Sequence, residues 1–164
     1  MSQETIAALQ NSVAELTQGF ASLTPILLKE REIIKKRRVD DIDAINGEIE
    51  TQLAALQRLD QFRQLHTKEL AKSLGLAGTK VTLSSLDEAL DGKAGLKALR
   101  EELVAAIEKA DKVNQENQAI FKGVQVATET LLRAVTGESS TGAGYNRQGK
   151  RQSSGSFHRF SKHL

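Results

Sequence analysis

Apolar residues recur at alternating spacings of three and four over most of this chain. Such spacing is typical of the seam along which one long helix packs against another. The first stripe comprises Ile6, Leu9, Val13, Leu16, Phe20, Leu23, Leu27 and Ile34, with Glu30 as its polar member. The last stripe comprises Leu96, Leu99, Leu103, Ala106, Ala110, Val113, Asn117, Ile120, Val124, Ala127, Leu131 and Ala134. Its one polar member, Asn117, is of the kind that fixes helix register at some cost in stability.

The stripe loses its phase after Ile34. The next apolar set is Ile42, Ile45, Ile49, Leu53 and Leu56, with Leu59 and Phe62 beyond. Basic residues at 35–38 suit a helix C-terminus, and the acidic residues that follow suit the start of another helix. We therefore expect a turn near 38–40 between helices at about 3–38 and 41–73, which form an antiparallel hairpin. One unbroken helix over 3–73 is the alternative.

Proline and glycine mark the remaining boundaries. Pro25 interrupts the first stripe without shifting its phase, which predicts a kink and not a break. A loop is expected at 74–85, where Ser84 with Asp87, and Ser85 with Glu88, resemble capping boxes for a short helix. A third long helix should span about 96–135. The predicted fold is all-α: a long antiparallel hairpin plus a third long helix in a coiled-coil-like bundle, with a short connecting helix and a disordered C-terminal tail.

Charge divides the chain at residue 137. The 28 residues of 137–164 hold five Lys or Arg and one Glu, together with five glycines and six serines. Since the whole chain carries +2, this segment accounts for +4 and residues 1–136 for −2. So polar a segment cannot bury enough apolar surface to offset the entropy of ordering. We expect a helical domain over 1–136 and a flexible basic Gly/Ser-rich tail over 137–164 without packing contacts.

Composition excludes several classes of function. The chain has no Cys, and its three His residues share no metal-ligand spacing, so no metal site and no cofactor are expected. Aromatic residues make up 4%, too few for a base-stacking platform, and the basic run at 35–38 suits a solvated helix end better than a nucleic-acid contact. Neither a signal peptide nor a membrane-spanning run is present, and no catalytic constellation can be argued. We expect a cytoplasmic interaction protein, neither an enzyme nor a nucleic-acid binder.

Two other classes stay open at this point. The stripes could form a homo-oligomeric structural or scaffolding coiled coil, in which the seams pack against copies of the same chain. The basic tail could belong to a regulator that binds nucleic acid, although it lacks a recognition motif. The sequence leaves the oligomeric state undetermined.

Three motifs, in this order, resemble the FlgN family. They are LLKEREIIKKRRVDDIDAINGEIETQLAALQRLDQFRQ at 27–64, NQENQAI at 114–120 and YNRQG at 145–149. The resemblance implies a flagellar type III export chaperone that binds the C-terminal helical segments of hook-associated proteins. Such a chaperone prevents premature assembly and delivers its cargo to the export gate and its ATPase.

The resemblance also implies roles for particular residues. The cargo-facing set would be Asn114, Asn117, Ile120, Val124, Ala127 and Leu131. Tyr145 would dock on the export gate. The ending FHRFSKHL, at 157–164, matches nothing in the family, and no role is assigned to it.

Overall fold

The structure, a computed structural model, describes residues 3–76, 78, 80–137, 157–161 and 164. Its helices are α1 (Gln3–Lys35), α2 (Val39–Ser73), α3 (Leu83–Ala89), α4 (Leu96–Thr136) and α5 (His158–Ser161). The described residues include no strand. The all-α prediction is therefore confirmed, with a hairpin of two long helices, a short connecting helix and a third long helix.

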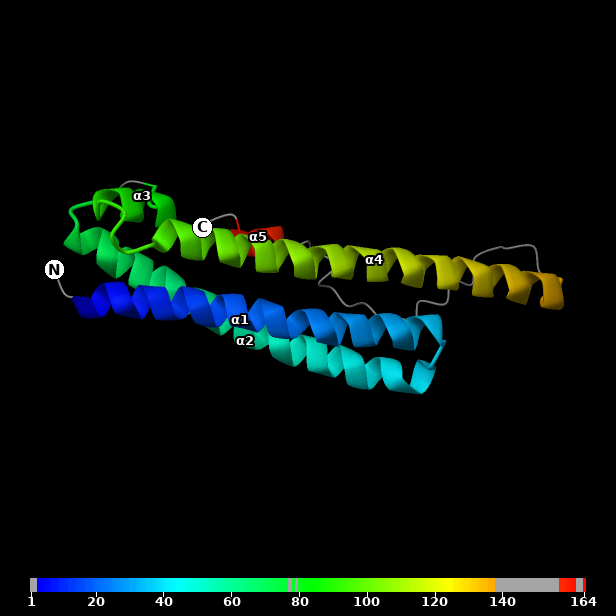
Figure 1. The fold of residues 1–164 in the computed structure, drawn as a ribbon. Coiled ribbons are helices and arrows are strands. Elements are labelled where there is room, and N and C mark those ends of the chain that lie inside the picture. Colours follow the sequence, from blue (N-terminus) through cyan, green and yellow to red (C-terminus); the bar gives the residue numbers. More distant parts are fainter. Residues whose placement is uncertain (1–2, 77, 79, 138–156, 162–163) are drawn as a thin grey trace.

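Helix α1 packs along both α2 and α4, whereas the described parts of α2 and α4 hardly touch each other. Near the hairpin turn α1 lies between the other two long helices, and α2 crosses α1 further along (Figure 1). Helices α1 and α4 run parallel, because contacts at both ends keep nearly the same offset. The Gln10 side chain donates to the Ala94 carbonyl at 2.8 Å, and that of Asn117 to the Leu27 carbonyl at 2.6 Å. The first stripe thus becomes the centre of the core.

Six side chains of that stripe are completely buried: Leu9, Val13, Leu16, Phe20, Leu23 and Leu27. Each contributes about 1.5–3 kcal/mol through burial of apolar surface. Pro25 lies within α1, which continues on both sides of it, so the helix does not break there. Gly19 lets α2 approach closely, because a Cβ atom at this position would lie 2.6 Å from Leu56 Cδ2.

The hairpin turn lies between Lys35 and Val39, where Arg37 takes a left-handed backbone conformation with φ of 52°. The predicted turn is confirmed, and the unbroken helix over 3–73 is wrong. The four basic residues at 35–38 are exposed. Lys35 and Lys36 lie within 4.0 Å of Glu32, and the Arg38 guanidinium lies 2.6 Å from the Asp41 carboxylate.

The core stripe of α2 changes along its length. Ile45, Ile49, Leu53 and Leu56 are buried as predicted. Phe62, expected to continue the stripe, is instead 54% exposed, and the neighbouring Arg63 is buried. Arg63 can occupy a core position because its guanidinium is paired with the Asp60 carboxylate at 2.9 Å.

The short helix α3 is capped differently from the prediction. Its N-cap is Thr82, whose hydroxyl accepts the Ser85 N–H, while the Ser85 hydroxyl accepts the Thr82 N–H. The predicted pairings of Ser84 with Asp87 and of Ser85 with Glu88 are therefore wrong. Asp87 instead accepts hydrogen bonds from the first two N–H groups of α4, Leu96 and Lys97.

Candidate functional site

Helix α4 extends well beyond the end of the hairpin (Figure 1). Asn117 contacts Leu27 and Glu30, so the end of α1 at Lys35 lies level with about residue 122 of α4. We call residues 121–136 of α4 the overhang. Its sixteen residues correspond to about 24 Å of helix.

The overhang exposes a broad apolar face. The large apolar side chains that are exposed there are Phe121, Val126, Leu131, Leu132 and Val135. Leu131 is 58% exposed and Val135 84% exposed. By helical periodicity, Lys122, Glu129 and Arg133 lie opposite Val124, Leu131 and Val135, and Val126 lies beside Arg133 on that polar side. The overhang is therefore an amphipathic helix whose apolar side has no partner among the described residues, the type of surface that binds another helix.

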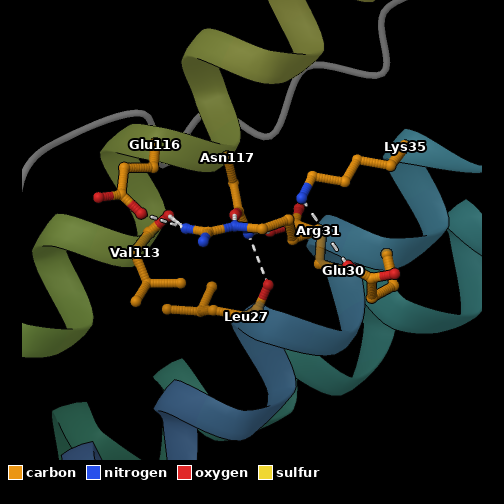
Figure 2. Close-up of polar contacts among 8 residues, drawn as sticks. Leu27, Glu30, Arg31, Lys35, Val113, Glu116 and Asn117 are labelled. Carbon is orange, nitrogen blue, oxygen red and sulfur yellow. Dashed lines mark hydrogen bonds and ion pairs between the residues drawn. The ribbon is translucent and has the colours of Figure 1, made fainter.

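A polar network fixes α4 to α1 at the base of the overhang (Figure 2). The buried Asn117 amide donates to the Leu27 carbonyl and, at 2.8 Å, to the carboxylate of Glu30. Its oxygen accepts a hydrogen bond from Arg31 Nε at 2.9 Å, and Arg31 also pairs with Glu116. The polar members of the first and last stripes thus meet each other.

The predicted cargo-facing residues fall into two groups. Asn114 and Asn117 are buried, and Asn117 contacts α1. Ile120 and Val124 are half-buried, and Ala127 and Leu131 are exposed on the overhang. Only the second group presents an accessible apolar face in the free chain. Tyr145 lies outside the described residues.

The C-terminal segment, with described residues 157–161 and 164, packs against the helical body. Phe157, Phe160 and Leu164 are buried, and the Phe20 ring lies 6.1 Å from that of Phe157 and 5.1 Å from that of Phe160. For these residues the expectation of a tail without packing contacts is wrong. The average composition of 137–164 is polar, but its last eight residues place apolar side chains at spacings of three and four, as an amphipathic helix does.

Two polar groups of α4 hold the ends of this segment. The buried Asp111 carboxylate accepts the backbone N–H of Phe157 at 2.8 Å. Arg100 Nε donates to the carbonyl oxygen of Leu164 at 3.3 Å. We call the area formed by Phe20, Arg100 and Asp111 the α1–α4 surface. The sequence does not reveal this surface, because only the Phe-x-x-Phe-x-x-x-Leu spacing of its ligand is visible there.

Neither a membrane span nor a metal site appears in the described part of the chain. No helix there is long and apolar enough to cross a membrane. No group of three or more His, Asp or Glu side chains there is arranged to hold a metal ion.

Comparison with protein families identifies the family of this chain. The model of the FlgN protein family matches residues 1–153, which is most of the chain and includes all of α1–α4. The match ends before the C-terminal segment begins. Comparisons with curated proteins and with solved structures found no significant match.

Proposed function

Because this chain belongs to the FlgN family of flagellar export chaperones, we propose that it binds the C-terminal helical segments of hook-associated proteins. It holds them in the cytoplasm, prevents their premature assembly, and delivers them to the export gate and its ATPase. Binding and release of a helix require no chemical step and no cofactor. The function is therefore that of a binding protein and not of an enzyme.

The exposed apolar face of the overhang carries this proposal. A cargo helix that lies along the overhang would cover Val124, Ala127 and Leu131, and Ile120 would be at the inner end of the contact. Helix-in-groove recognition uses anchors at such spacings. Asn114 and Asn117 would contribute by holding α4 in register with α1, so that the overhang projects in a fixed direction.

Charged substitutions on the overhang test the proposal. Val124→Asp and Leu131→Asp should each weaken binding of a synthetic hook-associated C-terminal peptide at least tenfold, because the cargo helix would bury the new carboxylate. Helix content by circular dichroism should stay unchanged, since Leu131 is already exposed and Val124 half-buried. Titration calorimetry measures the affinity. Lys122→Asp, which places the same acidic side chain on the polar side of the same helix, is the matched control and should bind normally.

Unchanged peptide affinity in both variants would contradict the cargo assignment. Unfolding of both variants would likewise show that the stripe belongs to the core. The same exposed face also suits a homo-oligomeric coiled coil, the second candidate function. A dimeric mass by light scattering that becomes monomeric in Leu131→Asp, with no peptide binding in either protein, would favour that scaffold.

A further inference from the structure

The C-terminal segment, which contains α5 and three apolar anchor residues, is not used by the proposed function. Phe157, Phe160 and Leu164 occur at positions i, i+3 and i+7, and the residues between them are polar. This spacing is the anchor pattern by which amphipathic helices dock on other proteins. All three side chains are buried. The chain thus supplies a helical ligand to its own surface.

The α1–α4 surface recognises this ligand by three separate contacts. The Phe20 ring faces both phenylalanines, and the ring pair with Phe160 is edge-to-face, with an interplanar angle of 79°. Asp111 accepts the Phe157 N–H at the start of α5, where a helix has free donors. Arg100 holds the other end, so the segment runs antiparallel to α4. Asp111 contacts a backbone N–H group, so this contact does not depend on which side chains the bound helix carries. Another helix with aromatic anchors can therefore replace this one.

Another helix can replace the docked segment, because neither the length of α5 nor the chain connection holds it in place. Helix α5 has four residues, too few to persist without the surface beneath it. Nineteen residues, 138–156, separate it from α4. Along α4, Asp111 and Gly137 are about 39 Å apart, and nineteen residues reach up to about 65 Å. Because this reach exceeds the distance, the chain connection allows the segment to dock and does not hold it in place.

We infer that the α1–α4 surface is a second helix-binding surface, that the C-terminal segment with its described residues 157–161 and 164 occupies it in the free chain, and that a cargo helix displaces this segment. The competition rests on the proposed function. The exposed overhang residues Phe121 and Leu132 lie within about 80° of Asp111 around α4. A cargo helix that covers these two side chains and extends past the overhang therefore comes close to the place where Phe157 is bound. The C-terminal segment keeps this surface covered until such a helix arrives.

The first experiment tests the surface without any cargo. A fluorescent peptide of residues 154–164 is added to full-length chain carrying Phe157→Ser and Phe160→Ser, which leaves the surface open. Anisotropy should show saturable binding. The unmodified chain should bind the peptide at least tenfold more weakly, because its own segment competes at an effective concentration of about a millimolar. A peptide with serine at both phenylalanines is the control.

Two outcomes overturn the inference here. The peptide fails to bind an opened chain whose circular dichroism shows normal helix content, or it binds the opened and unmodified chains equally. If the double variant loses helix content, hydrogen exchange in the unmodified chain decides the question. The Phe157 and Phe160 amides should exchange more slowly there than in a chain with Asp111→Ala, and equal exchange overturns the inference.

The second experiment uses the hook-associated peptide and the unmodified chain. On its addition, the Phe157 and Phe160 amides should lose protection from hydrogen exchange, and the opened variant should bind this peptide several-fold more tightly. Retained protection in a chain that has bound the peptide overturns the displacement but leaves the proposed function intact. If the peptide binds neither chain, the proposed function is contradicted, and so is the competition that rests on it. The first experiment still tests whether the α1–α4 surface binds a helix.

Discussion

At the scale of single residues, the network around Asn117 determines how α4 sits on α1. Asn117 and Glu30 are the polar members of two otherwise apolar stripes, and they meet at 2.8 Å. In a purely apolar seam, a shift of α4 by one turn would cost little packing. Here such a shift would separate a buried amide from the Leu27 carbonyl and the Glu30 carboxylate. The network therefore specifies where the overhang begins.

Asn117→Ala should lower the free energy of unfolding by about 2–3 kcal/mol, because it removes buried hydrogen bonds to Leu27, Glu30 and Arg31. Urea unfolding followed by circular dichroism measures the change. Gln125→Ala deletes a comparable side chain from the exposed side of the same helix and should change stability by less than about 0.5 kcal/mol. Similar losses in both variants would show that Asn117 contributes through helix propensity alone.

At the scale of helices, local periodicity was enough to predict the three long elements. The expected spans of 3–38, 41–73 and 96–135 differ by at most three residues at each end from Gln3–Lys35, Val39–Ser73 and Leu96–Thr136. Apolar residues recur with helical spacing over the part of each helix that packs against a neighbour, so the length of the stripe gives the length of the helix. The caps were mispredicted, because Asp87 bonds to a helix nine residues further on instead of to its own.

The start of α4 depends on that distant carboxylate. Its N-cap, Gly95, has no side chain, and Asp87 Oδ1 and Oδ2 accept the N–H groups of Leu96 and Lys97 at 3.1 and 3.2 Å. Asp87→Ala should therefore reduce the free energy of unfolding by about 1–2 kcal/mol. Thermal and urea unfolding measure it. Glu88→Ala, at an exposed position of the same short helix, is the control, and an equal effect there would refute the capping role.

At the scale of the molecule, the two ends of α4 differ in what covers them. Its N-terminal half is covered by α1 and the C-terminal segment, whereas the overhang extends past the hairpin (Figure 1). Among the described residues, nothing covers the apolar side chains of the overhang. The sequence predicted the stripe continuously to Ala134 and could not show where its partner stops. That limit is set by the length of α1. The burial of Phe157 was equally hidden, because its contacts with Phe20 and Asp111 join residues far apart in sequence.

The length of chain after α4 limits how far Tyr145, the proposed docking residue, can lie from the proposed cargo face. Tyr145 follows Gly137, the residue at which α4 is capped, by eight residues, a reach of about 28 Å at most. It is the only Tyr of the chain, and Arg147, Lys150 and Arg151 follow it. An aromatic anchor beside basic residues suits an acidic partner surface, since charge complementarity raises the rate of association. Cargo and export gate could then be bound at the same end of the molecule.

Tyr145→Ala should impair delivery of the cargo to the export gate and leave protection of the cargo in the cytoplasm intact. Because Tyr145 lies outside the overhang, cargo affinity should stay within about twofold and helix content should not change, whereas docking to the export gate should weaken at least tenfold through loss of a binding anchor. Secretion of hook-associated proteins should fall several-fold while their cytoplasmic stability holds. Tyr145→Phe keeps the ring and should retain most of the secretion. Cells with Tyr145→Ala that secrete these proteins and swim normally would show that the gate binds a different part of this chain.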